Sequence, residues 1–170
     1  MSHELITAAI LTLSDKGSRG EREDLGGPLI REMIKTIGAE VLYYEIIPDE
    51  KELIKEKLIE YSKSVDLLIT TGGTGLSPRD VAPDATREVI EREIPGIAEA
   101  MRMAGLKKTN RAMLSRAVAG IRGKTLIINL PGSPKAVKEG LEAIMDVIPH
   151  AVEKINGSTE DCALSEGARR

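Results

Sequence analysis

The stretch from residue 70 to residue 86 has the composition of a binding site for a phosphorylated ligand. Three of its glycines fall within four positions, which lets backbone N–H groups approach a ligand closely. Arg79 and Asp80 follow, a fixed cation and a hard carboxylate of the kind that bind phosphate and Mg²⁺. Nearby hydroxyls add hydrogen-bond donors. The glycines are Gly72, Gly73 and Gly75, and the hydroxyl residues are Thr70, Thr71, Thr74 and Ser77.

This stretch matches neither of two familiar nucleotide-binding loops. A Walker A loop needs a lysine after its last glycine, and no lysine follows Gly75. A dinucleotide fingerprint that started at Gly73 would need glycine where Pro78 stands. For the glycines alone, a strand-to-helix turn without a ligand is the alternative. The cation, the carboxylate and the hydroxyls in the same loop favour ligand binding.

Composition narrows the class of function. The chain has 170 residues, of which 41% are hydrophobic, enough for one domain with its own core. It has no Phe, no Trp and three Tyr, so the core is expected to be aliphatic, and base stacking on aromatic rings is not expected. With a net charge of −3 and no basic run, the chain is not expected to bind nucleic acid.

Cysteine, histidine and apolar patterning point to a cytoplasmic protein without a histidine site. The single cysteine, Cys162, has no partner for a disulfide and no adjacent base, so it is expected to be inert. His3 and His150 are isolated in the sequence, which leaves no histidine metal cluster and no Ser-His-Asp triad. The residues after Met1 lack the basic segment of a signal peptide, and no apolar run approaches the ~18 residues of a membrane span. We therefore expect no membrane association.

Apolar runs alternate with helical stripes along the chain and predict an α/β fold with a mostly parallel sheet covered by helices on both faces. Residues 1–155 are expected to form a single domain and residues 156–170 a tail. The expected strands are 5–13, 41–47, 65–70, 112–114, 117–121 and 124–130. The expected helices are 25–37, 51–61, 84–93, 96–106 and one long final helix with the stripe Val137, Leu141, Ile144 and Ile148.

Polar segments follow four of these strands, where ligands bind in parallel α/β sheets. Because the carboxyl ends of parallel strands meet at one edge, the four segments are expected to form a single site. They are residues 14–24, 48–50, 71–80 and 129–134.

Several residues of these segments also have a purely structural interpretation. Asp49 precedes a helix with Glu52 three residues later, which is typical of an N-cap in a capping box, although its second oxygen would still be available to the site. Asp84 is expected to cap its helix. Ser133 and Pro134 suit the N-cap and first position of the final helix, an end that would present free N–H groups to an anion.

Charged and polar residues outside the glycine loop give a less specific indication of function. Lys16, Arg19 and Arg22 are typical of a solvated loop, but beside a phosphate site at least one of them is expected to contact the ligand. Ser115 and Arg116 have no interpretable chemistry of their own and are expected to form a surface turn.

The combined motifs resemble the Mog/MoaB family of molybdenum-cofactor biosynthesis over about residues 5 to 150. They occur in the family's order and spacing. One difference is Lys16, which stands where many members have Arg. The motifs are Ser14-Asp15-Lys16, Pro48-Asp49-Glu50, Thr70-Thr71-Gly72-Gly73-Thr74-Gly75, Arg79-Asp80-Val81, Pro83-Asp84-Ala85-Thr86, Leu114-Ser115-Arg116 and Asn129-Leu130-Pro131-Gly132-Ser133-Pro134.

The resemblance implies a three-layer α/β/α sandwich, a homotrimer, and molybdopterin adenylyltransferase activity. In that reaction AMP passes from ATP to molybdopterin and pyrophosphate leaves, with Mg²⁺ as cofactor and the molybdenum-insertion enzyme as a further partner. By similarity, Asp49 and Asp80 are the catalytic pair and the Mg²⁺ ligands. The implied substrate- and phosphate-binding residues are Ser14, Asp15, Lys16, Thr71, Gly72, Gly73, Thr74, Gly75, Arg79, Ser115, Asn129, Pro131, Gly132 and Ser133.

Two other functions fit the same motifs. One is a non-catalytic paralogue of the same fold that binds molybdopterin or a nucleotide. The other is a molybdate-inserting ligase, which usually has additional domains for which 170 residues leave no room.

Overall fold

In the computed structural model, residues 5–159 are described, and their strands form one six-stranded sheet in the order β2-β1-β3-β6-β5-β4. Strands β2, β1, β3 and β6 are parallel to one another, β5 is antiparallel to β6, and β4 is antiparallel to β5. The strands are β1 (Ile6–Leu13), β2 (Ala39–Ile47), β3 (Leu67–Thr71), β4 (Arg92–Glu93), β5 (Ala119–Arg122) and β6 (Thr125–Leu130).

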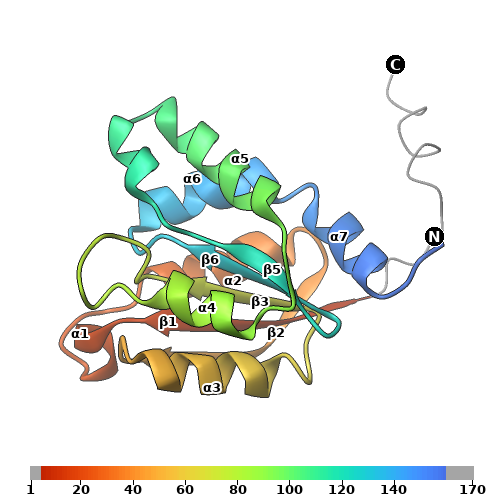
Figure 1. Cartoon of the computed structure of the whole chain (residues 1–170), viewed down its shortest axis with the longest axis horizontal. Coiled ribbons are helices and arrows are strands. Elements are labelled where there is room, and N and C mark those ends of the chain that lie inside the picture. Colours follow the sequence, from red (N-terminus) through yellow and green to blue (C-terminus); the bar gives the residue numbers. More distant parts are fainter. Residues whose placement is uncertain (1–4, 160–170) are drawn as a thin grey trace.

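Helices cover both faces of the sheet, which confirms the expected three-layer α/β/α sandwich (Figure 1). Helices α3 and α4 pack on one face, and α2, α5, α6 and α7 pack on the other. The helices are α1 (Asp15–Ser18), α2 (Gly26–Lys35), α3 (Lys51–Tyr61), α4 (Ala82–Val89), α5 (Pro95–Leu106), the 3-10 helix η1 (Asn110–Leu114), α6 (Pro134–Ile144) and α7 (Ile148–Ile155).

The near-continuous apolar run of β1 reflects burial on both faces of the sheet. Ala8 and Ile10 lie in the core under α2, α5 and α6, whereas Ala9 and Leu11 face the core under α3 and α4. Buried aliphatic side chains of β3 and β6 continue both cores, so the central strands are fixed firmly relative to one another. The loops that leave their carboxyl ends therefore start from rigid positions.

Three of the expected elements differ from the structure: the strand at 112–114, the long final helix and the helix at 84–93. Residues 112–114 belong to η1 rather than to a strand, and the side chain of Thr109 caps that helix by accepting from the Arg111 N–H. The long final helix is divided into α6 and α7, because Pro149 in the first turn of α7 has no N–H to donate back to the preceding helix.

The helix expected at 84–93 ends at Val89 instead. The Glu91 N–H donates to the Ile121 carbonyl (2.8 Å) and the Ile94 N–H to the Ala119 carbonyl (2.8 Å). These bonds attach β4 to the edge of the sheet.

Part of the expected tail is described and contacts the domain. Asn156 donates from Nδ2 to the Asp66 carboxylate (3.3 Å), next to the start of β3. His3, Cys162 and the rest of the tail lie outside the described residues, and the division at residue 155 stays a prediction. Within residues 5–159, no helix has the length and apolar character needed to cross a membrane.

Candidate functional site

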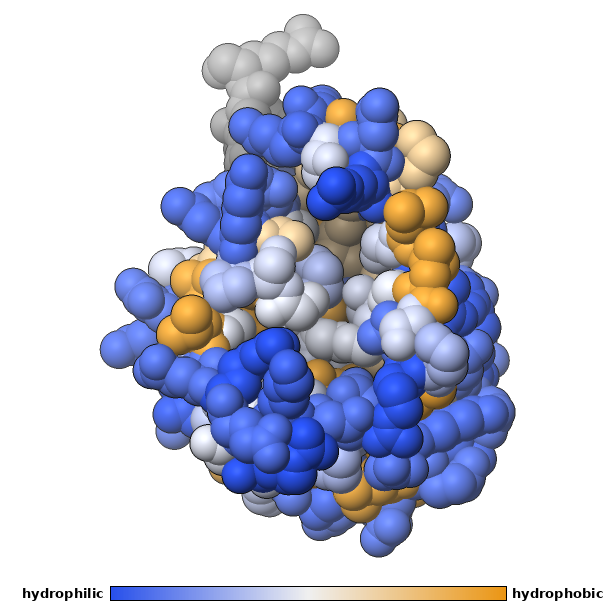
Figure 2. All heavy atoms as spheres, turned by 90° about the vertical axis from the view of Figure 1, so that its left-hand side faces the viewer, coloured by the Kyte–Doolittle hydropathy of each residue, from blue (hydrophilic) through white to orange (hydrophobic). Residues whose placement is uncertain are grey.

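A pocket of about 620 Å³, with many polar and charged residues in its wall, opens at the edge of the sheet where the carboxyl ends of the parallel strands meet. All four polar segments that follow these strands contribute, so the structure brings them together as expected. Figure 2 shows this face of the molecule hollowed near its middle. The sequence-predicted residues in the wall are Ser14, Asp15, Lys16, Asp49, Thr71, Gly72, Gly73, Asp80, Gly132 and Ser133.

Six of the predicted binding residues lie outside this wall: Thr74, Gly75, Arg79, Ser115, Asn129 and Pro131. Asn129 is fully buried and links neighbouring elements, since its Nδ2 donates to the Thr70 and Thr86 hydroxyls and its Oδ1 accepts from the Val118 N–H. Pro131 accepts from the Thr71 hydroxyl through its carbonyl (2.7 Å). For all six residues, contact with substrate stays a prediction.

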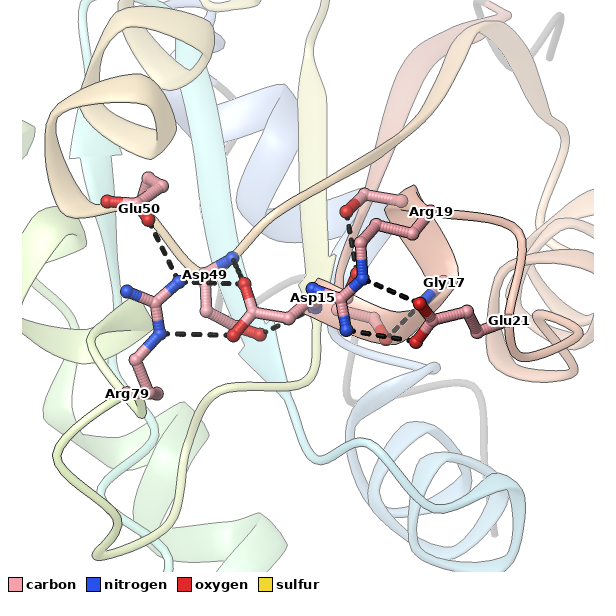
Figure 3. A network of polar contacts seen from close by, with 9 residues as sticks. Asp15, Gly17, Arg19, Glu21, Asp49, Glu50 and Arg79 are labelled. Carbon is pink, nitrogen blue, oxygen red and sulfur yellow. Dashed lines mark hydrogen bonds and ion pairs between the residues drawn. The ribbon is translucent and has the colours of Figure 1, made fainter.

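The carboxylates of Asp15 and Asp49 each accept a hydrogen bond from the backbone N–H of the other residue (Figure 3). The Asp15 N–H donates to Asp49 Oδ2 (3.0 Å), and the Asp49 N–H donates to Asp15 Oδ1 (3.0 Å). Helix α3 has Glu50 at its N-cap with no side-chain cap bond, so the capping-box interpretation of Asp49 is wrong. The pairing instead joins the loops after β1 and β2.

Asp49 lies in an environment that disfavours its negative charge. Burial raises the pKa of Asp49, the hydrogen bond from the Asp15 backbone lowers it, and the charges of Asp15 and Asp80 raise it further. Asp49 and Asp80 thus act on each other as like charges in the wall of one pocket. A bound divalent cation would relieve this repulsion.

The two carboxylates fit Mg²⁺ by their chemistry. Mg²⁺ is commonly bound by one or two carboxylates together with substrate phosphates rather than by a complete protein cage. Among residues 5–159, no group of three or more His, Cys, Asp or Glu side chains is arranged to hold a metal ion. A pair of carboxylates completed by substrate oxygens is therefore the form that a metal site would take here.

Arg79 connects the glycine loop to the loops after β1 and β2 (Figure 3). Its Nε donates to Asp15 Oδ2 (3.0 Å), and its Nη2 donates to Asp15 Oδ1 (2.8 Å) and Glu50 Oε1 (2.9 Å). This guanidinium holds the pKa of Asp15 below its ordinary value. The Arg79 side chain is 52% exposed, so the ion pairs orient the loops more than they stabilise the fold.

Two glycines allow the strand ends to pack closely around the pocket. Gly72 has φ +96° and Gly73 has φ +66°, conformations that other residues rarely adopt. A Cβ on Gly72 would overlap the Leu13 carbonyl oxygen at the end of β1, and one on Gly73 would lie 3.2 Å from Asp49 Oδ1. The Gly72 N–H donates to the Leu130 carbonyl (3.1 Å), so this glycine serves the packing of the strand ends rather than direct contact with a ligand.

Cationic groups and a helix end also face the pocket. Lys16 and Arg22 contribute to its wall, whereas Arg19 pairs with Glu21 (2.9 Å). The Ser133 hydroxyl accepts from the Ala136 N–H (3.2 Å) at the start of α6, which confirms the predicted N-cap. With Pro134 at the first position, this helix end lies in the pocket wall.

The interpretations of Asp84 and Arg116 are wrong. Asp84 is not the cap of α4, whose N-cap is Val81; it lies in the first turn, where its carboxylate accepts from Arg116 Nη2 (3.0 Å). Arg116 is half-buried and binds the glycine loop rather than forming a simple surface turn. The bonded residues are more than 30 positions apart in the chain, so local sequence patterns contain no signal for these contacts.

Asp24 is a wall residue that the sequence motifs did not indicate. One carboxylate oxygen accepts from the Gly26 N–H (3.0 Å) and the Gly27 N–H (3.1 Å), and the other accepts from the Thr12 hydroxyl (2.6 Å) and from the Tyr44 hydroxyl. Asp24 lies just before Leu25, the N-cap of α2, and accepts from the first two N–H groups of that helix from within the pocket wall. An aspartate before two glycines and an apolar stripe was the available sequence signal.

The Tyr44 phenol should ionise only in strong alkali. Burial and the hydrogen bond to Asp24 raise the pKa of Tyr44 from 10.0 to about 12. The resulting stabilisation is complete below pH 10 and is lost as the pH rises through about 12. Tyrosinate absorbance of the wild type minus that of Tyr44→Phe should give a transition near pH 12; a transition near pH 10 would contradict the hydrogen bond to Asp24.

A family model described as "Probable molybdopterin binding domain" matches residues 9–150 of the chain. Among the similar proteins, the molybdopterin adenylyltransferase of Helicobacter pylori is 45% identical over 159 residues, covering 91% of this chain and 90% of that protein. The Drosophila melanogaster molybdenum cofactor synthesis protein cinnamon is 43% identical over 155 residues, which cover 89% of this chain but 26% of that protein.

Solved structures show the same architecture. The crystal structure of the molybdopterin biosynthesis enzyme MoaB from Thermus thermophilus superimposes with a TM-score of 0.86 at 52% sequence identity. The match covers 91% of this chain and 98% of that one.

Proposed function

Because the chain belongs to the family of molybdopterin-binding domains, we propose that it is a molybdopterin adenylyltransferase in molybdenum-cofactor biosynthesis. It transfers AMP from ATP to the terminal phosphate of molybdopterin and releases pyrophosphate. The geometric support is a pocket at the strand ends whose wall combines Asp49 and Asp80 with the glycine turn, a lysine and a helix start. Such a pocket suits two anionic substrates whose reaction depends on charge neutralisation.

The reaction exchanges one phosphate bond for another. An oxygen of the molybdopterin phosphate attacks the α-phosphorus of ATP, the bond from that phosphorus to the bridging oxygen breaks, and pyrophosphate leaves with the electron pair. The attacking oxygen is already anionic, so the pocket needs no histidine or cysteine to activate it. Catalysis then rests on positioning and on stabilisation of charge.

Different residues of this chain bind the phosphates, hold the metal and position the loops. Lys16 and the Gly73 N–H neutralise and orient phosphates, together with the start of α6 beside Ser133, whereas the Gly72 N–H donates to the Leu130 carbonyl (3.1 Å). Asp49 and Asp80 would hold Mg²⁺, which supplies the positive charge that offsets the phosphates. Asp15 and Arg79 keep the loops around these carboxylates in place.

The test of the function is a direct assay of turnover. The purified protein is mixed with molybdopterin, ATP and Mg²⁺, and adenylylated molybdopterin and pyrophosphate are measured. We expect both products in equal amounts. A protein that binds molybdopterin but releases no pyrophosphate would be the non-catalytic paralogue, and the proposed function would be wrong.

ATP binding should depend on Mg²⁺. The pocket wall has five carboxylates against two cations, Lys16 and Arg22, so free ATP would meet uncompensated negative charge. We expect calorimetry to give a dissociation constant of ATP that is at least tenfold higher in EDTA than in excess Mg²⁺. A tenfold change corresponds to about 1.4 kcal/mol in binding free energy. Equal affinities would contradict the role of Asp49 and Asp80 as metal ligands.

We also propose that the protein is a cytoplasmic homotrimer that passes its product to the molybdenum-insertion enzyme. The trimer follows from the resemblance to the Mog/MoaB family. Sedimentation velocity at micromolar concentration should give a single species of three times the chain mass of 18.4 kDa. A monomer would remove the trimer from the proposal and leave the catalytic roles of Asp49 and Asp80 unaffected.

A further inference from the structure

The part of the glycine loop that presents Asp80 to the pocket has little support from the hydrophobic core. Residues 76–79 are exposed, and the Leu76 side chain is 65% exposed. Within the loop, the Ser77 N–H donates to Asp80 Oδ2 (2.9 Å) and the Asp80 N–H donates to the Ser77 carbonyl (2.9 Å). These bonds close a local turn but do not fix the turn relative to the sheet.

Arg79 attaches this stretch to Asp15 and Glu50 at its exposed surface, and Arg116 provides a second attachment from a segment outside the loop. The Arg116 backbone N–H donates to the Thr74 carbonyl (2.9 Å), and its Nε donates to the Gly75 carbonyl (2.9 Å). Its Nη2 donates to the Asp80 carbonyl (2.5 Å). One planar guanidinium thus binds both ends of the segment from Gly75 to Asp80, and this sets the distance between them.

The guanidinium is itself held in position. Asp84, in the first turn of α4, accepts from Nη1 (3.3 Å) and Nη2 (3.0 Å), and Arg116 in turn holds the pKa of Asp84 below its ordinary value. Behind Arg116, the side chain of Arg102 donates to the carbonyls of Ser115 (3.3 Å) and Ala117 (3.1 Å). Arg116 therefore approaches the loop from a backbone that is fixed on both sides.

We propose that Arg116 is a positioning residue for adenylyl transfer, which acts by fixing the backbone of Asp80 and so the direction of its carboxylate. This inference rests on the proposed function. The Asp80 carboxylate has one oxygen committed to Ser77, so a small rotation of the turn would redirect the whole group relative to the pocket. Displacements of about 1 Å in a catalytic group can reduce the rate by about 100-fold.

The test variant is Arg116→Gln, with Arg116→Lys as a partial replacement. We expect kcat of the glutamine variant to fall about 100-fold while KM for molybdopterin changes less than about threefold, since the lost positioning acts on the transition state. Lysine offers one ammonium in place of a fork, so its kcat should be intermediate. The dissociation constant of ATP with Mg²⁺, from calorimetry, should rise in the same order without any need for turnover.

Two controls separate positioning from general stability. Asp84→Asn removes the charge of the ion pair but keeps an amide oxygen that can accept from Arg116, and it leaves the bonds from Arg116 to Gly75 and Asp80, so its kcat should stay within about fivefold of the wild type. Arg122→Gln removes a bond from Nη1 to the Val89 carbonyl (2.8 Å) at the far end of α4 and should leave kcat unchanged. Thermal melting of each variant checks that it is folded.

The outcomes are distinct. Wild-type kcat in folded Arg116→Gln, or an equal loss in Asp84→Asn, would overturn the inference, as would a change confined to KM for molybdopterin. If the wild type itself made no adenylylated product, the proposed function would fail. In that case the dissociation constants of ATP with Mg²⁺ would still decide whether Arg116 holds the loop. Equal constants for the wild type, Arg116→Lys and Arg116→Gln would show that Arg116 does not hold it.

Discussion

Replacing Asp80 by Asn is expected to abolish most adenylyl transfer while the fold and molybdopterin binding survive. The amide has the size of the carboxylate, and its oxygen can still accept from the Ser77 N–H, so the turn should keep its shape. What is lost is a negative charge at the proposed metal position. Loss of such charge stabilisation costs roughly 3 kcal/mol or more in the transition state, a fall in kcat of about two to three orders of magnitude.

The same substitution at Asp49 should have a comparable effect. Asparagine can accept from the Asp15 N–H as the carboxylate does, so the link between the loops after β1 and β2 should persist. If Asp49 served only that link, Asn would replace it with little change in unfolding free energy and leave kcat intact. Turnover of Asp49→Asn thus separates a catalytic role from a structural one.

The matched control is Asp66→Asn at the opposite end of the same sheet. Asp66 accepts from the Thr7 N–H (2.9 Å) and hydroxyl (2.8 Å) just before β3 begins, far from the pocket wall. Its kcat should equal that of the wild type. The double variant of Asp49 and Asp80 should lose little more than either single variant, because the two side chains would hold one cation. Full activity in Asp80→Asn would contradict the mechanism.

The sheet was predictable because its information is local. The apolar runs of β1, β3 and β6 are long enough to identify strands buried on both faces, and the intervening helical stripes imply parallel connections. The position of the pocket then follows from topology, since loops after parallel strands open on one edge. No side-chain contact was needed to place Asp49 and Asp80 in the same wall.

Short elements were harder to predict because a few apolar residues suit several structures. Residues 112–114 are apolar and suggested a strand, but the Thr109 side chain caps a 3-10 helix there. At Pro149, an uninterrupted apolar stripe concealed the end of one helix and the start of another. In both cases a single cap or a missing N–H decided the outcome.

The contacts that organise the site could not be predicted from sequence, for a different reason. The bonds of Asp15 to Asp49, and of Arg116 to Gly75, join residues that are 34 and 41 positions apart. Such pairs exist only once the sheet has brought the loops together. Asn129 is the opposite case. The motif predicted a binding residue at this position but gave no indication that its side chain is buried in the core.

Replacing Gly72 by Ala should be the most destabilising change of those considered at the strand ends. Gly72 has φ +96°, and an added Cβ would overlap the carbonyl oxygen of Leu13, a rigid part of β1. Backbone strain of about 1–3 kcal/mol adds to the cost of moving the two strand ends apart. We expect the unfolding free energy to fall by at least about 3 kcal/mol, measured by chemical denaturation.

Gly123→Ala is the control that isolates this packing effect. Gly123 also has a positive φ, +56°, but a Cβ there would meet no atom within 4 Å. Its cost should therefore be limited to the left-handed conformation, about 1–2 kcal/mol, with no loss of adenylyl transfer. Equal destabilisation by the two substitutions would mean that the conformation of Gly72 matters and its contact with Leu13 does not. A larger cost at Gly72, together with lost activity, would show that the close contact between β1 and β3 sets the shape of the pocket.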